Sequence, residues 1–202
     1  MTIKRKYLKH GDIVEIHLPL TNSFAYGKLV DPRKIRDPFE YPFFIRIYNF
    51  TCTEHIVDVS KINRQLLLAP FWLQGQSVAV TKANWKILAN EPVDLHEEFI
   101  PDTKREFPIG SANPEKWTYV KRFNTIPIST EYAQIKHLDY SSGKNIEIVP
   151  FLVQLEILKQ KGKDIKKEYG LKDWLEELYY KNFINMPVYV DLPEKLKEKL
   201  AC

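Results

Sequence analysis

Histidine, cysteine and paired carboxylates are the side chains in this sequence that could support catalysis or bind a metal ion. The five histidines are scattered, without the HExxH or HxH spacing that places two ring nitrogens on one metal ion. Cys52 and His55 could form a thiolate couple, but side chains three residues apart on a strand point to opposite faces. We therefore predict no catalytic residues, no metal site and no cofactor.

Two pairs of adjacent glutamates could share a divalent cation, because carboxylate oxygens are the ligands such cations prefer. Glu176 and Glu177 fall in a predicted helix, where neighbouring side chains diverge by about 100°, so they indicate a solvated face. Glu97 and Glu98 lie in an acidic segment that ends at Asp102. We predict that Glu97 and Glu98 contact a protein partner, because a local acidic patch complements a basic surface.

Basic and aromatic residues gather in residues 31–42, which contain three prolines and are predicted to form an exposed loop. Arginine and aromatic side chains are enriched in protein interfaces, so Arg33, Arg36 and Tyr41 are candidate partner-binding residues. The same loop and the basic residues 4–6 could instead bind nucleic acid. A net charge of only +4 counts against that alternative, since nucleic-acid modules are more basic.

A third alternative is a hydrolase whose site assembles from residues distant in the sequence, such as His55, Asp58 and His96. Sequence spacing alone does not exclude it. The scattered glycines, seven in all, form neither a GxGxxG nor a GxxxxGK loop, which counts against nucleotide-dependent enzymes.

The first half of the chain is predicted to consist mainly of short strands, which position the candidate residues in this half. Alternation of apolar and polar residues predicts strands, and leucines at helical spacing after Ser60 predict a short helix. Gly27 within the second strand predicts a bulge or the close approach of another backbone. These elements form a mostly β unit, either a curved sheet or a small barrel, with strands at 12–18, 24–30, 43–50, 77–81 and 85–88 and the helix at 60–68.

The second half combines a strand with helices. Four prolines between residues 91 and 115 predict a linker. An amphipathic helix is expected to bury the stripe Leu171, Trp174, Leu175 and Leu178. The class is therefore α+β, with a β-rich unit at 1–92 and an α+β extension at 93–202. The predicted strand covers 117–123, and the predicted helices cover 150–161, 171–183 and 193–200.

The composition fits a folded chain in a reducing compartment. Of 202 residues, 44% are hydrophobic and 28% charged, close to the averages for soluble domains. No run approaches the roughly 18 apolar residues of a membrane span. Two cysteines are too few for a disulfide framework, so we expect a cytoplasmic protein that does not enter a membrane.

Three segments together resemble the immunity protein 26 family of bacterial polymorphic toxin systems. They are residues 11–19 (GDIVEIHLP), 24–30 (FAYGKLV) and 85–92 (WKILANEP), and the resemblance covers about residues 8–93. It implies a cytoplasmic antitoxin that binds and neutralises a cognate protein toxin, and it implies no catalytic residues. An aromatic-rich β scaffold suits such an inhibitor, because stoichiometric binding requires surface complementarity rather than chemistry.

Overall fold

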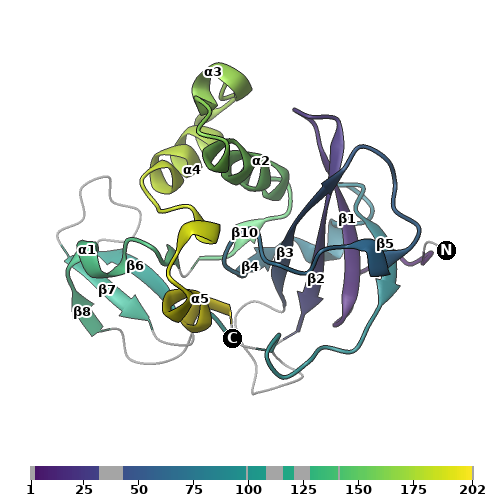
Figure 1. The fold of residues 1–202 in the computed structure, drawn as a ribbon, viewed down its shortest axis with the longest axis horizontal. Helices are drawn as coiled ribbons and strands as arrows, with labels where there is room; N and C mark the ends of the chain where they lie inside the picture. The colour runs from purple at the N-terminus through teal and green to yellow at the C-terminus, as the bar shows by residue number, and fades with distance from the viewer. Residues whose placement is uncertain are drawn as a thin grey trace.

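A computed structural model describes residues 3–31, 43–98, 100–107, 116–120, 128–140 and 142–201. Its strands form two sheets, with five helices and short 3-10 segments around them (Figure 1). The predicted α+β class is confirmed. Neither sheet closes into a barrel in the described part of the chain, so the open-sheet alternative holds and the barrel alternative is wrong.

The first sheet has the strand order β10-β4-β3-β2-β1-β5. Its central strands are those that the alternating pattern predicts, and β1 and β2 form an antiparallel hairpin in which Glu15 lies opposite Tyr26. Strand β4 was not predicted, and β10 arrives from the second half of the chain to pair with it in parallel. The bounds are β1 (Asp12–Leu18), β2 (Ser23–Val30), β3 (Phe43–Cys52), β4 (Phe71–Gln74), β5 (Lys86–Asn90) and β10 (Lys144–Asn145).

Gly27 has both features that its position predicts. The register between β2 and β3 shifts between Ala25 and Gly27, which is a β-bulge. A Cβ on Gly27 would lie 2.9 Å from the main-chain oxygen of Arg46 on β3. The missing side chain therefore lets the two strands approach each other at the centre of the sheet.

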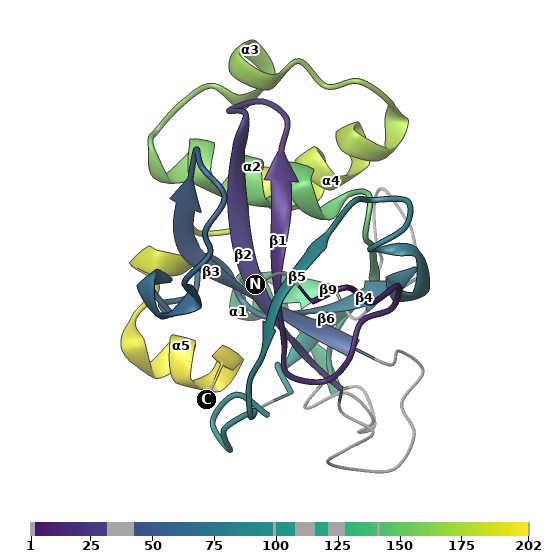
Figure 2. The ribbon, with the colours of Figure 1, turned by 90° about the vertical axis from the view of Figure 1, so that its right-hand side faces the viewer.

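The helices are α1 (Tyr132–Ile135), α2 (Val149–Gln160), α3 (Ile165–Tyr169), α4 (Trp174–Ile184) and α5 (Glu194–Ala201). The predicted helices at 150–161, 171–183 and 193–200 are thus confirmed within two or three residues at their ends. Helix α2 is almost wholly buried, because it lies between the first sheet on one side and α3 and α4 on the other (Figures 1 and 2). Among the residues described, no helix has the length and apolar character needed to cross a membrane.

The apolar core lies between the first sheet and α2. Val14 and Ile16 on β1 share one cluster with Val149 and Val153 on α2. The Leu20 N–H, just after β1, also donates to the buried Gln154 side chain on α2 over 2.7 Å. Residues from both halves of the chain therefore contribute to one apolar cluster.

Three predictions for individual elements are wrong. Residues 60–68 form no helix: only Val59–Lys61 is a 3-10 turn, and the Leu67 N–H donates to the Ile47 oxygen on β3 over 2.9 Å. Residues 77–81 are not a strand, because Gln76–Val78 is a 3-10 turn. The predicted linker at 91–115 contains strand β6, Thr103–Phe107.

The apolar stripe predicted for α4 is only partly buried. Trp174 is 73% exposed and Leu178 is 46% exposed. The helix instead packs through Leu175, Tyr179 and Phe183 against the cluster around α2. Its face is therefore rotated from the prediction, so two large apolar side chains remain in solvent.

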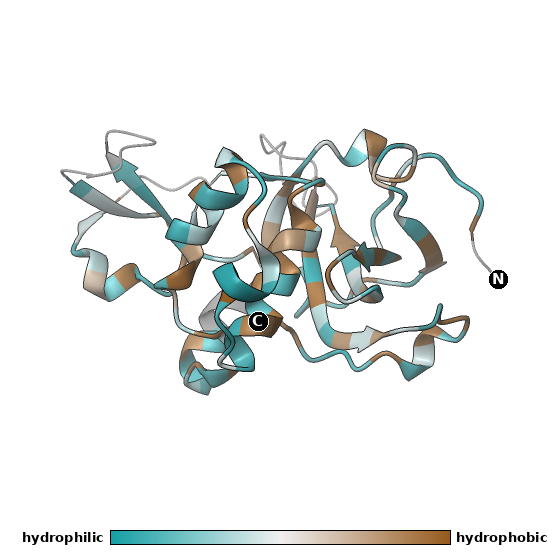
Figure 3. Cartoon of the chain, turned by 90° about the horizontal axis from the view of Figure 1, so that it is seen from above, coloured by the Kyte–Doolittle hydropathy of each residue, from teal (hydrophilic) through white to brown (hydrophobic). Residues whose placement is uncertain are grey.

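The second sheet has the order β8-β7-β6-β9, built from β6, β7 (Lys116–Val120), β8 (Ile128–Thr130) and β9 (Asp139–Tyr140). Strand β7 confirms the described part of the strand predicted at 117–123. The outer end of this sheet is mainly hydrophilic (Figure 3, left). At its inner end, Lys104 of β6 is buried beside the Tyr140 ring of β9, and Lys144 of β10 in the first sheet is buried beside the same ring.

Candidate functional site

The first sheet has a second face that carries buried charged and phenolic side chains instead of a purely apolar surface. Strand alternation places Glu15, Tyr26, Lys28, Arg46 and Tyr48 on this face, and all five are buried. Burying charges costs free energy unless they are paired, so their partners define how this face is built. We call it the polar face.

One row of the polar face runs across β5, β1 and β2 through Lys86, Glu15 and Tyr26, which are register partners. Oε1 of Glu15 lies 2.8 Å from Nδ1 of His55 and 3.5 Å from Nζ of Lys86. The Tyr26 hydroxyl donates to Oε2 of Glu15 over 3.4 Å. Burial, followed by the nearby Glu15 charge, raises the pKa of Tyr26, so this phenol stays protonated as a donor.

A second row contains Lys28 on β2 and Arg46 on β3, which are also register partners. Nζ of Lys28 donates to the Pro92 carbonyl over 2.6 Å and to Oε2 of Glu97 over 2.5 Å. The two side chains of the Lys28–Glu97 pair are 4% and 11% exposed. Burial acts to raise the pKa of Glu97, but the hydrogen bonds from Lys28 and the Asp94 main chain outweigh it and hold that pKa below its usual value.

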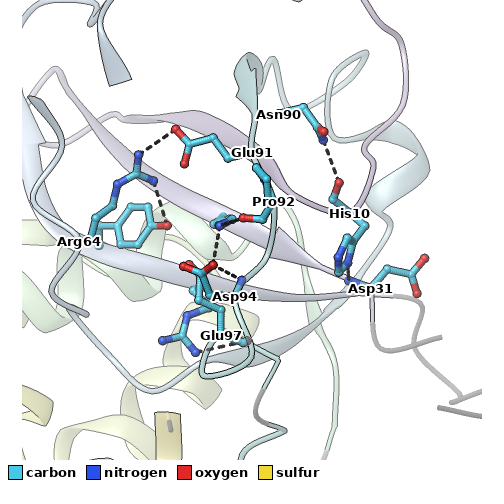
Figure 4. Close-up of polar contacts among 11 residues, drawn as sticks. His10, Asp31, Arg64, Asn90, Glu91, Pro92, Asp94 and Glu97 are labelled. Atoms are coloured by element: carbon cyan, nitrogen blue, oxygen red, sulfur yellow. Dashed lines mark hydrogen bonds and ion pairs between the residues drawn. The ribbon is translucent and has the colours of Figure 1, made fainter. Parts of the chain in front are cut away.

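Glu97 fixes a turn at residues 94–98, which stands over this row (Figure 4). The Asp94 N–H donates to Oε2 of Glu97 over 3.0 Å. In return, the N–H groups of Glu97 and Glu98 donate to the Asp94 carbonyl over 2.8 and 3.2 Å. The side chain at the tip, Leu95, is 88% exposed. The turn therefore presents one aliphatic side chain on a backbone that is closed by hydrogen bonds.

Arg64 joins the neighbouring loop to the same face (Figure 4). Its guanidinium donates to Oε1 of Glu91 over 3.1 Å and to the Tyr48 hydroxyl over 3.2 Å, and it lies 5.1 Å from the centre of the Tyr48 ring. Glu91 is three residues before Asp94 in the chain. The loop at 59–64 and the turn at 94–98 are thus tied to one part of the sheet.

The structure describes two of the five site residues predicted from the sequence. Glu97 and Glu98 lie in the turn at 94–98, where Glu97 is buried and Glu98 is partly exposed. Arg33, Arg36 and Tyr41 lie outside the described residues. Sequence reasoning missed Glu15, Lys28, Arg46 and Arg64, although a charged residue between apolar strand neighbours and the Asp94-x-x-Glu97 spacing were available signals.

The residues of the hydrolase alternative are not brought together by hydrogen bonds in the described part of the chain. His55 contacts Glu15 and stacks on Phe24 with 4.2 Å between ring centres. Asp58 accepts from Ser60, and His96 is exposed in the turn at 94–98. Across the same described segments, no three His, Cys, Asp or Glu side chains are grouped so as to hold a metal ion.

Comparison with known proteins gives one match. The model of the family Immunity protein 26 matches residues 9–118, more than half of the 202-residue chain. The match covers the whole polar face and the turn at 94–98, and it extends past residue 93 into the second sheet. Comparisons with curated proteins and with solved structures found no match. On the strength of the family match, the chain belongs to the immunity protein 26 family.

Proposed function

We propose that this chain is a cytoplasmic immunity protein that neutralises a cognate bacterial toxin by forming a stoichiometric complex with it, without performing a reaction. Membership of the immunity protein 26 family is the observation that carries this proposal. A polar face whose charged groups are paired with one another suits a rigid scaffold, because rigid partners lose little conformational entropy on binding.

We propose further that the turn at 94–98 forms part of the toxin-contact surface. A single exposed leucine is common on protein surfaces and by itself means little. Leu95 differs because the Lys28–Glu97 pair holds its turn in place, so little mobility is lost when it enters a pocket. Glu98 and Asp94 flank it with carboxylates, so the fitting toxin surface is an apolar pocket with a basic rim.

In this proposal Glu97 is a positioning residue, because its carboxylate faces Lys28 and the Asp94 N–H rather than solvent. Arg33, Arg36 and Tyr41 remain predicted contacts of the same toxin.

The test is to co-express the chain with the toxin domain encoded by the neighbouring gene, and to measure cell growth and the Kd of the purified complex. The native chain is expected to restore growth. Leu95→Ala is expected to weaken binding by about fivefold or more, since interface anchors contribute more than about 1 kcal/mol. Ile128→Ala is the matched control, because Ile128 is also an exposed aliphatic residue but lies on β8 of the second sheet.

Two results would contradict the proposal at different levels. Failure of the native chain to bind the toxin or to protect the cell would remove the proposed function. Equal affinities of the Leu95→Ala and Ile128→Ala variants, with a tight native complex, would remove only the assignment of the turn at 94–98.

A further inference from the structure

A polar groove of about 390 Å³ lies between β3 and α5, beside the polar face. Figure 2 shows α5 next to β3, although the two are far apart in the sequence. Arg46 and Asn49 of β3 line one side, Gln65 and Leu66 of the following loop line another, and Tyr189 and Lys197 close it from the C-terminal segment. Its size falls within the roughly 300–1,000 Å³ typical of ligand sites.

We propose that this groove receives the carboxylate side chain of an aspartate or glutamate on the bound toxin. The identity of the occupant rests on the function proposed above. The chemical class of the occupant rests on the groove itself, because its lining combines two cations and neutral amide groups with a single carboxylate, that of Glu194.

Arg46 is the residue best placed to bind that carboxylate. It stands on β3 near the middle of the first sheet, and its main chain pairs with that of Lys28 on β2. Its NH1 donates to the Glu97 carbonyl over 3.5 Å, which orients the guanidinium. The Arg46 side chain borders the groove, so its fixed positive charge attracts an anion that enters there.

The charge around the groove favours an anion. Lys197 adds a second cation, and its side chain is only 24% exposed. Glu194 also lines the groove, and its carboxylate lies 3.6 Å from the Lys197 ammonium. The Glu194 side chain is 79% exposed. Solvent screens the exposed carboxylate more strongly than the half-buried ammonium and the buried guanidinium. The groove therefore presents a net positive potential to a group that enters it.

The neutral part of the lining fits a carboxylate on a short aliphatic stem. The Asn49 N–H donates to the Gln65 carbonyl over 2.6 Å, so the backbones that carry these two amide side chains are held together. Their amide groups can donate to a carboxylate. Leu66 and Tyr189 supply apolar wall for the methylene groups of an aspartate or glutamate.

Arg46 lines the groove and also contacts the Glu97 carbonyl, so the groove lies close to the turn at 94–98. One toxin surface could therefore accept Leu95 in a pocket while inserting an acidic side chain beside Arg46. This arrangement pairs opposite charges at two points, which fixes the orientation of a complex.

The experiment is a titration of the isotopically labelled full-length chain, followed by NMR, with the blocked peptide acetyl-Ala-Glu-Ala-amide and its glutamine counterpart. The glutamate peptide is expected to shift the side-chain signals of Arg46, Asn49 and Gln65 saturably. It should bind roughly tenfold more tightly than the glutamine peptide, because hydrogen bonds to charged groups are stronger than neutral ones.

Two charge-reversal variants on α5 sharpen the test. Lys197→Glu places an anion in the groove and is expected to weaken glutamate-peptide binding and toxin binding by roughly tenfold or more. Lys195→Glu makes the same charge change on the same helix outside the groove lining, and its affinities should stay within about twofold. Gln65→Ala, on an exposed side chain, weakens peptide binding without altering α5.

Equal binding of the two peptides, no saturable shift, or equal effects of Lys197→Glu and Lys195→Glu on peptide binding would overturn the carboxylate site. If the peptide binds as expected but toxin affinity is the same in both variants, the toxin's acidic side chain is not the occupant. If the native chain forms no toxin complex, both the proposed function and the toxin side chain as occupant are ruled out. The peptide titration still decides whether the groove binds a carboxylate.

Discussion

The role of Glu97 in this structure is to hold the Lys28 ammonium and the Asp94 N–H in place. Its carboxylate neutralises the buried Lys28 ammonium and accepts the Asp94 N–H, so one side chain joins the sheet to the turn at 94–98. A buried ammonium that loses a charged partner is costly, whereas removal of a partly exposed carboxylate is not. Glu97 and Glu98 are therefore adjacent glutamates with different expected roles.

Substitution of Glu97 by glutamine is expected to lower the free energy of unfolding by about 3–5 kcal/mol, because it leaves Lys28 buried without a carboxylate. Glu98→Gln is the matched control and should change it by less than about 0.5 kcal/mol. Urea unfolding of both variants measures the difference. Equal stability of the two variants would show that the Lys28–Glu97 pair does not hold the turn.

The same pair gives a dependence on pH with a definite sign. The pKa of Glu97 is lowered in the folded chain, so its contribution is complete above its ordinary value of 4.5 and is lost as the pH falls through the lowered value. The native chain should therefore lose stability below about pH 4.5 more steeply than Glu97→Gln does.

Lys104 in the second sheet also has a lowered pKa, but there burial is the cause. Its side chain is fully buried, lies 5.0 Å from the Tyr140 ring centre and donates to the Lys136 carbonyl over 3.0 Å. Burial lowers its pKa to about 8, against the attraction of Asp139 and Glu106 and with the repulsion of Lys144. The folded chain thus releases this proton more readily than the unfolded chain.

Stability should consequently rise between about pH 8 and pH 10, where the folded chain binds fewer protons at this lysine than the unfolded chain. Lys104→Met is expected to flatten that rise and to leave stability at pH 7 equal or higher, because methionine carries no charge to desolvate. Thermal unfolding from pH 7.5 to 9.5 tests this. An unchanged slope in the variant would assign the rise to other groups.

At the scale of elements, β1 and β2 were predictable because their alternation and their hairpin are local. The segment at 60–68 was predicted as a helix because Ile62, Leu66 and Leu67 have helical spacing. In the structure its backbone instead pairs with β3, through Leu67 to Ile47, which lie twenty positions apart in the chain. Tertiary hydrogen bonding of this kind leaves no local signature, and the pairing of β10 with β4 is missed for the same reason.

The bulge at Gly27 should tolerate no side chain. Gly27→Ala would place Cβ 2.9 Å from the Arg46 carbonyl and 3.0 Å from Cδ1 of Ile47, so the strands must separate at an expected cost of about 1–3 kcal/mol. Gly162→Ala is a useful comparison, because no atom lies within 4 Å of the added Cβ and only the positive φ is unfavourable. A Gly27→Ala chain as stable as the native one would contradict the close approach.

The rotated face of α4 makes a second element-scale prediction. Leu175→Ala should destabilise the chain by about 0.5–3 kcal/mol, because Leu175 packs on the cluster around α2. Leu178→Ala, on the same helix but 46% exposed, should cost clearly less. Chemical denaturation of the two variants compares them directly, and a larger loss for Leu178 would restore the stripe predicted from the sequence.

At the scale of the whole molecule, the division into units at 1–92 and 93–202 stays a prediction. The family match crosses residue 93, and α2 contributes Val149 and Val153 to the core of the first sheet. The family itself was recognisable from three short segments. The polar face was not, because its pairs join residues as distant as Lys28 and Glu97, and only folding brings them together.

Stoichiometric titration of the toxin's activity tests the central claim most directly. A fixed concentration of the toxin domain, well above the Kd of the complex, is mixed with increasing amounts of the chain, and the remaining toxin activity is measured. Sequestration predicts a linear fall to zero at one equivalent, with full activity recovered when the complex is dissociated. Complete loss of activity at a small fraction of an equivalent would show that the chain turns over its partner, and no loss at any ratio would show that it does not bind this toxin.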